Sequence, residues 1–95
     1  MFARVAAFEG VNIPAMEERS KAALESGEMT LPDGCRRAMA LVDRHRLQQL
    51  FVTFFDSREA ISAAEEHFEQ MGEQIPEEVR GRRASVSVYA VAYDG

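Results

Sequence analysis

The sequence predicts a single α+β domain in which four strands and two helices follow one another in the order β-α-β-β-α-β. Four short apolar runs have the length of strands, and two stretches between them repeat apolar residues at helical spacing. With 95 residues, only six Gly and three Pro, the chain suffices for one domain, residues 1–95. Right-handed crossovers around a central hairpin then give a four-stranded antiparallel sheet with two helices on one face, the ferredoxin-like arrangement.

The first strand and the first helix have clear signals at their ends. The strand is predicted over Phe2–Glu9, where both alternating faces are mostly apolar. The helix is predicted over Ile13–Ser26. Asn12 is the expected N-cap, Pro14 lies in the first turn, where a missing N–H costs nothing, and Gly27 is the expected stop.

The middle of the chain reads as two strands joined by a short connection. A loop is expected over residues 28–34, because a Pro-Asp-Gly turn signal ends it. The second strand is predicted over Cys35–Asp43 and the third over residues 49–55, which are apolar on both faces. The polar residues 44–46 connect them.

The second helix is predicted to begin at residues 56–59, Asp-Ser-Arg-Glu, which match a capping box: a side-chain acceptor followed by Glu three residues later. Its apolar stripe consists of Ile61, Ala64, Phe68, Met71 and Ile75. Off that stripe lie Glu65, Glu66, Glu69 and Glu73, which predict a solvated face. Pro76 ends or bends the helix. Residues 77–83 form a charged connection to a last strand over residues 84–93.

The composition argues against several functional classes. A formal net charge of −5 opposes a phosphate-binding surface, so no nucleic-acid partner is expected. A single Cys cannot form an internal disulfide or a cysteine metal cluster. No apolar run reaches membrane-spanning length, and no signal peptide stands at the start. We therefore expect a cytoplasmic protein with no membrane partner, no metal and no cofactor.

The strand pattern also predicts an assembly. Two helices can cover only one face of the sheet, yet the first and third strands are apolar on both faces. The uncovered face must meet another surface, and a second copy of the chain is the simplest candidate. The expected assembly is a homodimer through the open sheet face.

Five segments spread along nearly the whole chain carry a family resemblance: 1–5 (MFARV), 31–34 (LPDG), 41–43 (LVD), 54–60 (FFDSREA) and 88–92 (VYAVA). In order and spacing they resemble the antibiotic-biosynthesis-monooxygenase-like group of dimeric α/β-barrel proteins. This resemblance implies homodimers with facing sheets and a pocket between sheet and helices in each subunit. It also implies, in some members, cofactor-independent oxygenation of an aromatic small molecule and, in others, haem degradation.

The chain departs from the catalytic members of that group. Many of them carry a Trp at the end of the third strand, where this sequence has Phe55 and no Trp anywhere. Haem-degrading members use an Asn on the first strand, absent here, and a His on the second helix, where this chain has His67. Three hypotheses stay open: a cofactor-independent oxygenase, a non-catalytic module that binds a small ligand or a partner, and haem binding or degradation.

RNA-recognition motifs share the same order of elements. Residues 51–54, Phe-Val-Thr-Phe, match the second half of their third-strand motif. Residues 47–50 lack the basic residue, the Gly and the first stacking aromatic of the first half. The acidic net charge also opposes RNA binding, because stacking platforms work beside a basic groove.

Three residues are the catalytic candidates: His67, Tyr89 and Arg4. His67 flanks the apolar stripe of the second helix, where it could take a proton or bind haem iron, or could simply bond a neighbouring Glu. Tyr89 could orient an aromatic substrate, or pack its ring locally. Arg4 stands in an apolar strand and needs an anionic partner, either a ligand or a carboxylate such as Asp43 or Glu9.

Three phenylalanines are the candidates for a ligand pocket: Phe55, Phe51 and Phe68. They suit a flat apolar or aromatic ligand, and equally an ordinary core. Cys35 is a weaker candidate. Neighbouring arginines could favour its thiolate, but no Cys–His spacing typical of a nucleophile is recognisable.

Overall fold

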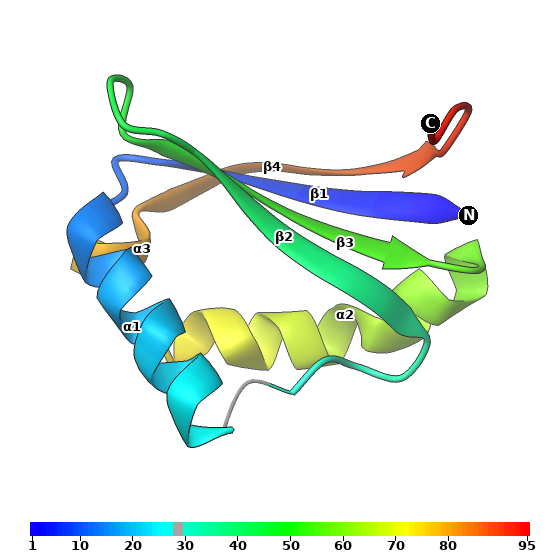
Figure 1. Cartoon of the computed structure of the whole chain (residues 1–95), viewed down its shortest axis with the longest axis horizontal. Coiled ribbons are helices and arrows are strands. Elements are labelled where there is room, and N and C mark those ends of the chain that lie inside the picture. The colour runs from blue at the N-terminus through cyan, green and yellow to red at the C-terminus, as the bar shows by residue number, and fades with distance from the viewer. Residues whose placement is uncertain (28–29) are drawn as a thin grey trace.

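The computed structural model describes residues 1–27 and 30–95. Their elements are β1 (Phe2–Glu9), α1 (Ile13–Ser26), β2 (Cys35–Asp43), β3 (Gln48–Phe55), α2 (Arg58–Glu73), α3 (Glu77–Arg80) and β4 (Arg82–Ala90). The strands form one antiparallel sheet in the order β2-β3-β1-β4. Helices α1 and α2 lie on the same side of it (Figure 1). The predicted α+β fold with ferredoxin-like order is confirmed; the pairing of two such sheets stays a prediction.

The bounds of β1, α1 and β2 agree with the sequence because strong local signals flank them. The side chain of Asn12 accepts a hydrogen bond from the Ala15 N–H at 3.2 Å, as an N-cap does. Gly27 ends α1 in the left-handed region, with φ of 74°, and donates its N–H to the Ala23 carbonyl. Within the predicted loop over residues 28–34, residues 28 and 29 lie outside the described part of the chain.

The later bounds differ from the prediction. Strand β3 begins at Gln48, one residue early, and β4 covers Arg82–Ala90 instead of residues 84–93. The expected charged connection contains the helix α3, a single turn that is too short to show helical periodicity. Among the described helices, none is long and apolar enough to cross a membrane.

The start of α2 corrects the predicted capping box. The N-cap is Ser57, whose Oγ accepts a hydrogen bond from the Ala60 N–H at 3.1 Å. The third helical position is therefore Ala60, so no Glu returns a hydrogen bond to the cap. The carboxylate of Asp56 instead accepts a hydrogen bond from Arg36 Nε at 2.8 Å.

The core lies between the sheet and α2. Phe55 is fully buried at the end of β3, and Ile61, Ala64 and Phe68 of α2 pack against it. The ring of Phe68 meets those of Phe55 and Phe51 edge to face, at centroid distances of 6.1 and 6.4 Å. This cluster attaches α2 to the centre of the sheet.

Gly81 joins α3 to β4 in a backbone conformation that only glycine adopts readily, with φ of 74° and ψ of −165°. A Cβ at this position would lie 2.2 Å from the carbonyl oxygen of Glu9. The missing side chain lets the start of β4 lie against the end of β1, where Arg82 pairs with Glu9 both in the sheet and by an ion pair.

The face of the sheet turned away from the helices is largely apolar. Residues opposite each other on neighbouring antiparallel strands share a face, and every second residue along a strand returns to it. This open face carries Ala3, Val5, Ala7, Met39, Leu41, Leu50, Val52, Phe54 and Tyr89. Leu41 and Tyr89 are 50% and 58% exposed, and no described element covers them (Figure 1).

Candidate functional site

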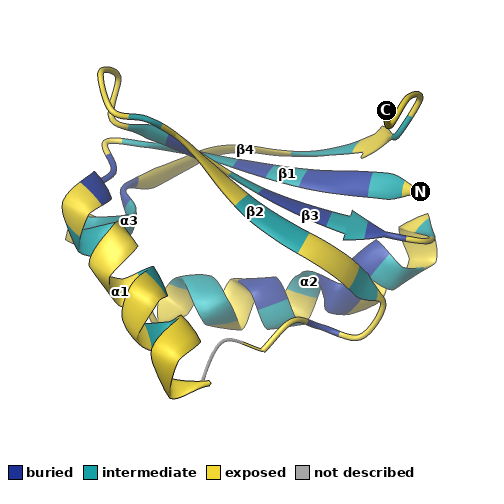
Figure 2. Ribbon diagram, in the orientation of Figure 1, coloured by how far each residue is buried: buried dark blue, intermediate teal, exposed yellow. Residues whose placement is uncertain are grey.

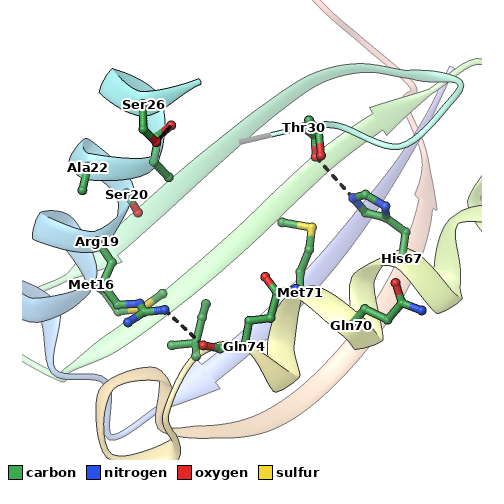
Figure 3. A pocket seen from close by; sticks show the side chains of 12 residues that line it. Met16, Arg19, Ser20, Ala22, Ser26, Thr30, His67, Gln70, Met71 and Gln74 are labelled. Atoms are coloured by element: carbon green, nitrogen blue, oxygen red, sulfur yellow. Dashed lines mark hydrogen bonds between the residues drawn. The ribbon is translucent and has the colours of Figure 1, made fainter. Parts of the chain in front are cut away.

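A groove with a volume of about 630 Å³ lies between α1 and α2, on the helical side of the sheet (Figure 3). Both helices and the segments that follow them line it. The described lining residues are Met16, Arg19, Ser20, Ala22, Ala23, Ser26, Thr30, His67, Gln70, Met71, Gln74 and Ile75. A groove of this size falls in the range of small-molecule sites.

The groove exists because α1 is buried mainly at its N-terminal end. Val11 and Ile13 are each 2% exposed, and the Val11 N–H donates to the Leu47 carbonyl at 2.9 Å. Farther along, Leu24 is 67% exposed, and most of the helix surface is open (Figure 2). The C-terminal end of α1 lies farther from the sheet than its N-terminal end, which leaves space beside α2 (Figure 1).

Helical spacing brings the lining side chains to the facing sides of the two helices. On α1, Met16, Ser20 and Ala23 recur at intervals of three or four residues, as do His67 and Met71 on α2. The α1 wall therefore offers a flexible thioether, a hydroxyl and a methyl group, which leave the space unfilled.

His67 sits at one end of the groove. Its Nε2 lies 3.2 Å from the carbonyl oxygen of Thr30 (Figure 3), so the segment after α1 is bonded to α2 at this point. Its ring stands edge to face with Phe68, at a centroid distance of 6.2 Å. A second, smaller pocket of about 390 Å³ lies against the same histidine and includes Leu31 and Pro32. Of the three catalytic candidates, His67 alone lines the groove.

Arg19 joins the two walls at the other end. Its Nη2 donates a hydrogen bond to the backbone carbonyl of Gln74 at 3.1 Å (Figure 3). Gln74 is the C-cap of α2, where carbonyl groups lack helical partners and carry partial negative charge. The guanidinium has five N–H donors, and this bond uses one of them.

None of the carboxylates of α1 and α2 belongs to the described lining of the groove, and several are paired elsewhere. Arg44 donates to both carboxylate oxygens of Glu17, at 2.6 and 2.9 Å, and Arg83 donates to Glu69 at 2.7 Å. The hydrogen bond from Arg44 holds the pKa of Glu17 below its ordinary value. The hydrogen bond from Arg83 does the same for the pKa of Glu69. These acids stabilise the outer surface and leave the groove without a described carboxylate.

Arg4 is held in a structural ion pair. Its side chain is 2% exposed, and it donates from Nε and Nη2 to the two carboxylate oxygens of Glu65, at 2.9 and 3.2 Å. The guanidinium also lies 4.2 Å from the ring centroid of Phe68. Of the two anionic partners that the sequence left open, a ligand or a carboxylate, the structure has a carboxylate, and it is Glu65 and not Asp43 or Glu9.

Glu65 also corrects the prediction of a uniformly solvated face on the second helix. It is half-buried, because it reaches back under α2 to Arg4. Asp43 instead accepts hydrogen bonds from the backbone N–H groups of His45 and Arg46, both at 3.0 Å, and so shapes the turn between β2 and β3.

Tyr89 lies on the opposite side of the sheet from His67. It pairs with Ala3 in the ladder between β1 and β4, and its neighbour Val88 is the residue that packs on the core under α2. The structure therefore does not bring His67, Tyr89 and Arg4 together. Tyr93, which would share a strand face with Tyr89, lies beyond the end of β4 and is 88% exposed.

The predicted pocket residues Phe51, Phe55 and Phe68 form the core under α2, and none of the three lines the groove between the helices. Cys35 packs on the edge of the same core, and burial raises the pKa of its thiol. Its Sγ donates weakly to the Arg37 carbonyl at 3.5 Å. A thiol with a raised pKa is a poor nucleophile at neutral pH.

The sequence placed Met71 on the apolar stripe of the second helix, and it did not single out Met16, Ser20, Arg19 or Gln74 as site residues. Their helical spacing was visible in the sequence, but the angle between α1 and the sheet was not. Among the described residues, no group of three or more His, Cys, Asp or Glu side chains could hold a metal ion.

No protein-family model and no curated protein matches the chain. Among solved structures, the chain is similar to the one titled "Structure of Rv0793 from Mycobacterium tuberculosis", with a TM-score of 0.62 and 21% sequence identity. The match covers 98% of this chain and 96% of that chain. The likeness shows the fold. It extends over the whole ferredoxin-like domain, including both helices that form the groove.

Proposed function

We propose that this chain is a small-molecule-binding domain that acts without turnover and works as a homodimer. Its ligand occupies the groove between α1 and α2, and a second copy covers the open face of the sheet. We favour this function over an enzyme because the three catalytic candidates, His67, Tyr89 and Arg4, do not share one site.

The groove supports ligand binding by its size and by its mixed lining. Its volume of about 630 Å³ suits a small molecule. Hydroxyl and amide groups are available from residues such as Ser20 and Gln70, beside the apolar side chains of Met16 and Met71. Such a surface holds an amphipathic molecule by apolar contact and by a few hydrogen bonds.

The arrangement of polar groups argues against catalysis in this groove. Arg4 is committed to Glu65 and is 2% exposed, so it does not reach a ligand there. Tyr89 lies on the other face of the sheet. His67 is the one imidazole in the described lining, and no described carboxylate of that lining orients its ring.

The open face supports the homodimer. Its apolar residues come from all four strands, and exposed side chains such as Leu50 on the inner strand β3 and Leu41 on the edge strand β2 belong to it. An apolar patch of this extent on a small domain is typical of an interaction site. In a symmetric dimer both copies use the same patch, so the apolar face of each chain is removed from water.

The alternative is an oxygenase related to the antibiotic-biosynthesis-monooxygenase-like proteins. The sequence resemblance and the place of His67 in the groove favour it. We expect purified protein mixed with phenolic substrates to take up no oxygen in an electrode assay. Oxygen uptake that disappears in His67→Ala would overturn the non-catalytic proposal in favour of this enzyme. A Soret band formed with haemin and lost in the same variant would favour haem binding.

Ligand binding is tested by NMR of protein labelled with ¹³C at its methionine methyl groups. A panel of small aromatic and aliphatic molecules is added, and binders are expected to shift the methyl signals of Met16 and Met71. Met39 lies on the open face and serves as the internal control. Ala23→Phe should fill the groove and abolish these shifts, whereas Glu18→Phe, on an exposed part of α1, should not. Molecules that shift the methyl signal of Met39 alone would refute ligand binding in the groove.

The homodimer is tested by light scattering after gel filtration at micromolar concentration. The wild-type protein should have the mass of two chains, and Leu41→Asp should convert it to a monomer, because a carboxylate would be buried in the interface. Leu24→Asp, at an exposed leucine of α1, is the matched control and should remain dimeric. A monomeric wild-type protein would contradict the assembly.

A further inference from the structure

The groove differs from the rest of the molecule in its charge. The chain contains 16 Asp and Glu against 11 Lys and Arg. Helices α1 and α2 alone carry Glu17, Glu18, Glu25, Glu59, Glu65, Glu66, Glu69 and Glu73. None of these lines the groove, and the one formally charged side chain in its described lining is the cation Arg19. A cationic groove in an acidic protein favours an anionic ligand.

Arg19 also differs from most arginines of this protein. Six others, at positions 4, 36, 44, 46, 82 and 83, form ion pairs with carboxylates. Within the described residues, the partner of Arg19 is the neutral backbone carbonyl of Gln74. This bond holds the guanidinium at the groove and leaves most of its donors and its whole charge for a ligand.

The surroundings of Arg19 limit how much negative charge the groove accepts. The C-terminal ends of α1 and α2, at Ser26 and Gln74, both contribute to the lining. Helix C-termini carry partial negative charge and repel anions. The one cation is itself bonded to the α2 end, so it suits a single negative charge, and a monocarboxylate fits better than a phosphate with its greater charge.

The apolar lining points to an aliphatic tail. Met16, Met71 and Ile75 provide flexible or branched aliphatic surface, and no Phe or Tyr occurs in the described lining. Methionine side chains adapt to an irregular chain, whereas flat aromatic ligands are usually held by stacked rings. Met16 and Met71 both line the groove, and in Figure 3 Met71 lies between Arg19 and His67, so a chain that starts at the guanidinium and runs toward His67 would cross its thioether.

We infer that the groove binds an aliphatic monocarboxylate, with the carboxylate on Arg19 and the tail across Met16 and Met71. This inference rests on the proposed function, because it names the class of ligand for the same groove. Ser20 and Gln70 also line the groove and can donate hydrogen bonds to a hydroxyl group on the tail.

The experiment compares three probes of equal chain length by methionine-methyl NMR: octanoate, 1-octanol and octylammonium. Octanoate should shift Met16 and Met71 with a Kd about fivefold lower than that of 1-octanol, because one charge-assisted contact at a partly exposed site contributes about 1 kcal/mol. Octylammonium should bind more weakly than either. Arg19→Ala should raise the Kd of octanoate to that of 1-octanol, and Arg19→Lys should raise it less.

Arg46→Ala is the matched control, because Arg46 is an exposed arginine in the turn between β2 and β3, away from the groove lining. It should leave all three Kd values unchanged. Equal binding of octanoate and 1-octanol at Met16 and Met71 would overturn the carboxylate assignment while the groove remained a ligand site. Absence of any shift at these two methyl groups with all three probes would overturn the groove itself, and the proposed function with it.

Discussion

Helices α1 and α2 lie on the same face of one sheet, but only α2 is built into the core. Ile61, Ala64 and Phe68 of α2 are 3%, 4% and 7% exposed, whereas Ile13 is the buried residue of α1. Leu24, near the C-terminal end of α1, is 67% exposed, and most of this helix is coloured as exposed in Figure 2. The two helices therefore have different tasks: α2 stabilises the sheet, and α1 forms the wall of a groove.

The difference arises from side-chain size on the inward faces. The inward residues of α2 include Phe68, whose ring interlocks with two phenylalanines of β3. The inward residues of α1 include Ser20 and Ala23, which are too small to fill the space toward α2. Two equally packed helices would leave no room for a ligand, so an incompletely packed α1 is a condition for the proposed function.

The largest expected effect separates the two helices directly. Phe68→Ala should lower the free energy of unfolding by about 3–5 kcal/mol, because it removes a buried ring from the core. Leu24→Ala should change it by less than about 0.5 kcal/mol, because this side chain is mostly in solvent. Urea titration followed by circular dichroism measures both values. A Leu24→Ala variant as unstable as Phe68→Ala would show that α1 is packed in solution.

The ion pair beneath α2 should give the next largest effect. Glu65→Met leaves the Arg4 guanidinium buried without an anion and should cost about 2–3 kcal/mol, below the cost for a fully buried pair because Glu65 is 43% exposed. Adding Arg4→Met removes the stranded charge and should recover most of that loss. The same urea titrations report both variants.

The matched control for this pair is Glu66→Met, at the exposed neighbouring glutamate, which should be nearly neutral. A double variant as unstable as Glu65→Met alone would mean that losing the contact of Arg4 with the Phe68 ring costs as much as removing the stranded charge recovers.

The fold could be predicted where local chemistry decides the structure. Asn12 and Gly27 mark the ends of α1 through capping that depends on neighbouring residues alone. The start of β4 could not be predicted in the same way. It depends on Gly81 fitting against the Glu9 carbonyl, which is a contact between residues far apart in the sequence.

The candidate site was less accessible to sequence reasoning for a related reason. That Arg4 needs an anionic partner follows from its apolar strand, but the choice of Glu65 depends on how α2 is rotated over the sheet. Met16 and Met71 have the spacing of core residues. Whether they meet or leave a groove depends on the tilt of α1, and no single residue encodes that tilt.

The helix caps should give a smaller, more local effect. Asn12→Ala removes the acceptor for the Ala15 N–H and should cost α1 about 1 kcal/mol. Because α1 has few buried contacts, it should open without global unfolding. Hydrogen exchange of its amides should therefore become about fivefold faster, while the amides of α2 keep their rates.

Ser57→Ala, the same loss at the cap of α2, is the counterpart variant. It should lower global stability by about 1 kcal/mol, since α2 unfolds together with the core. If Asn12→Ala accelerated exchange equally in both helices, α1 and α2 would form one cooperative unit, and the distinction between them would fail.

The smallest expected effect concerns two exposed ion pairs, Glu17–Arg44 on α1 and Glu69–Arg83 on α2. Each glutamate has a lowered pKa in the folded protein. The stabilisation that each pair provides is therefore fully present above the ordinary pKa of about 4.5 and is lost as the pH falls through the lowered pKa. Glu17 owes its shift to Arg44 alone, whereas Glu69 is also in the field of Arg4 and Arg80.

NMR titration of the side-chain carboxyl carbons distinguishes these two situations. Arg44→Gln should return the pKa of Glu17 to its ordinary value, because its one cationic partner is removed. Arg83→Gln should return that of Glu69 only in part, because Arg4 and Arg80 remain. Added salt should reduce both shifts, since the pairs are exposed. If the pKa of Glu69 returned fully to its ordinary value in Arg83→Gln, Arg4 and Arg80 would not act on Glu69. The outer face of α2, like that of α1, would then be held by a single ion pair.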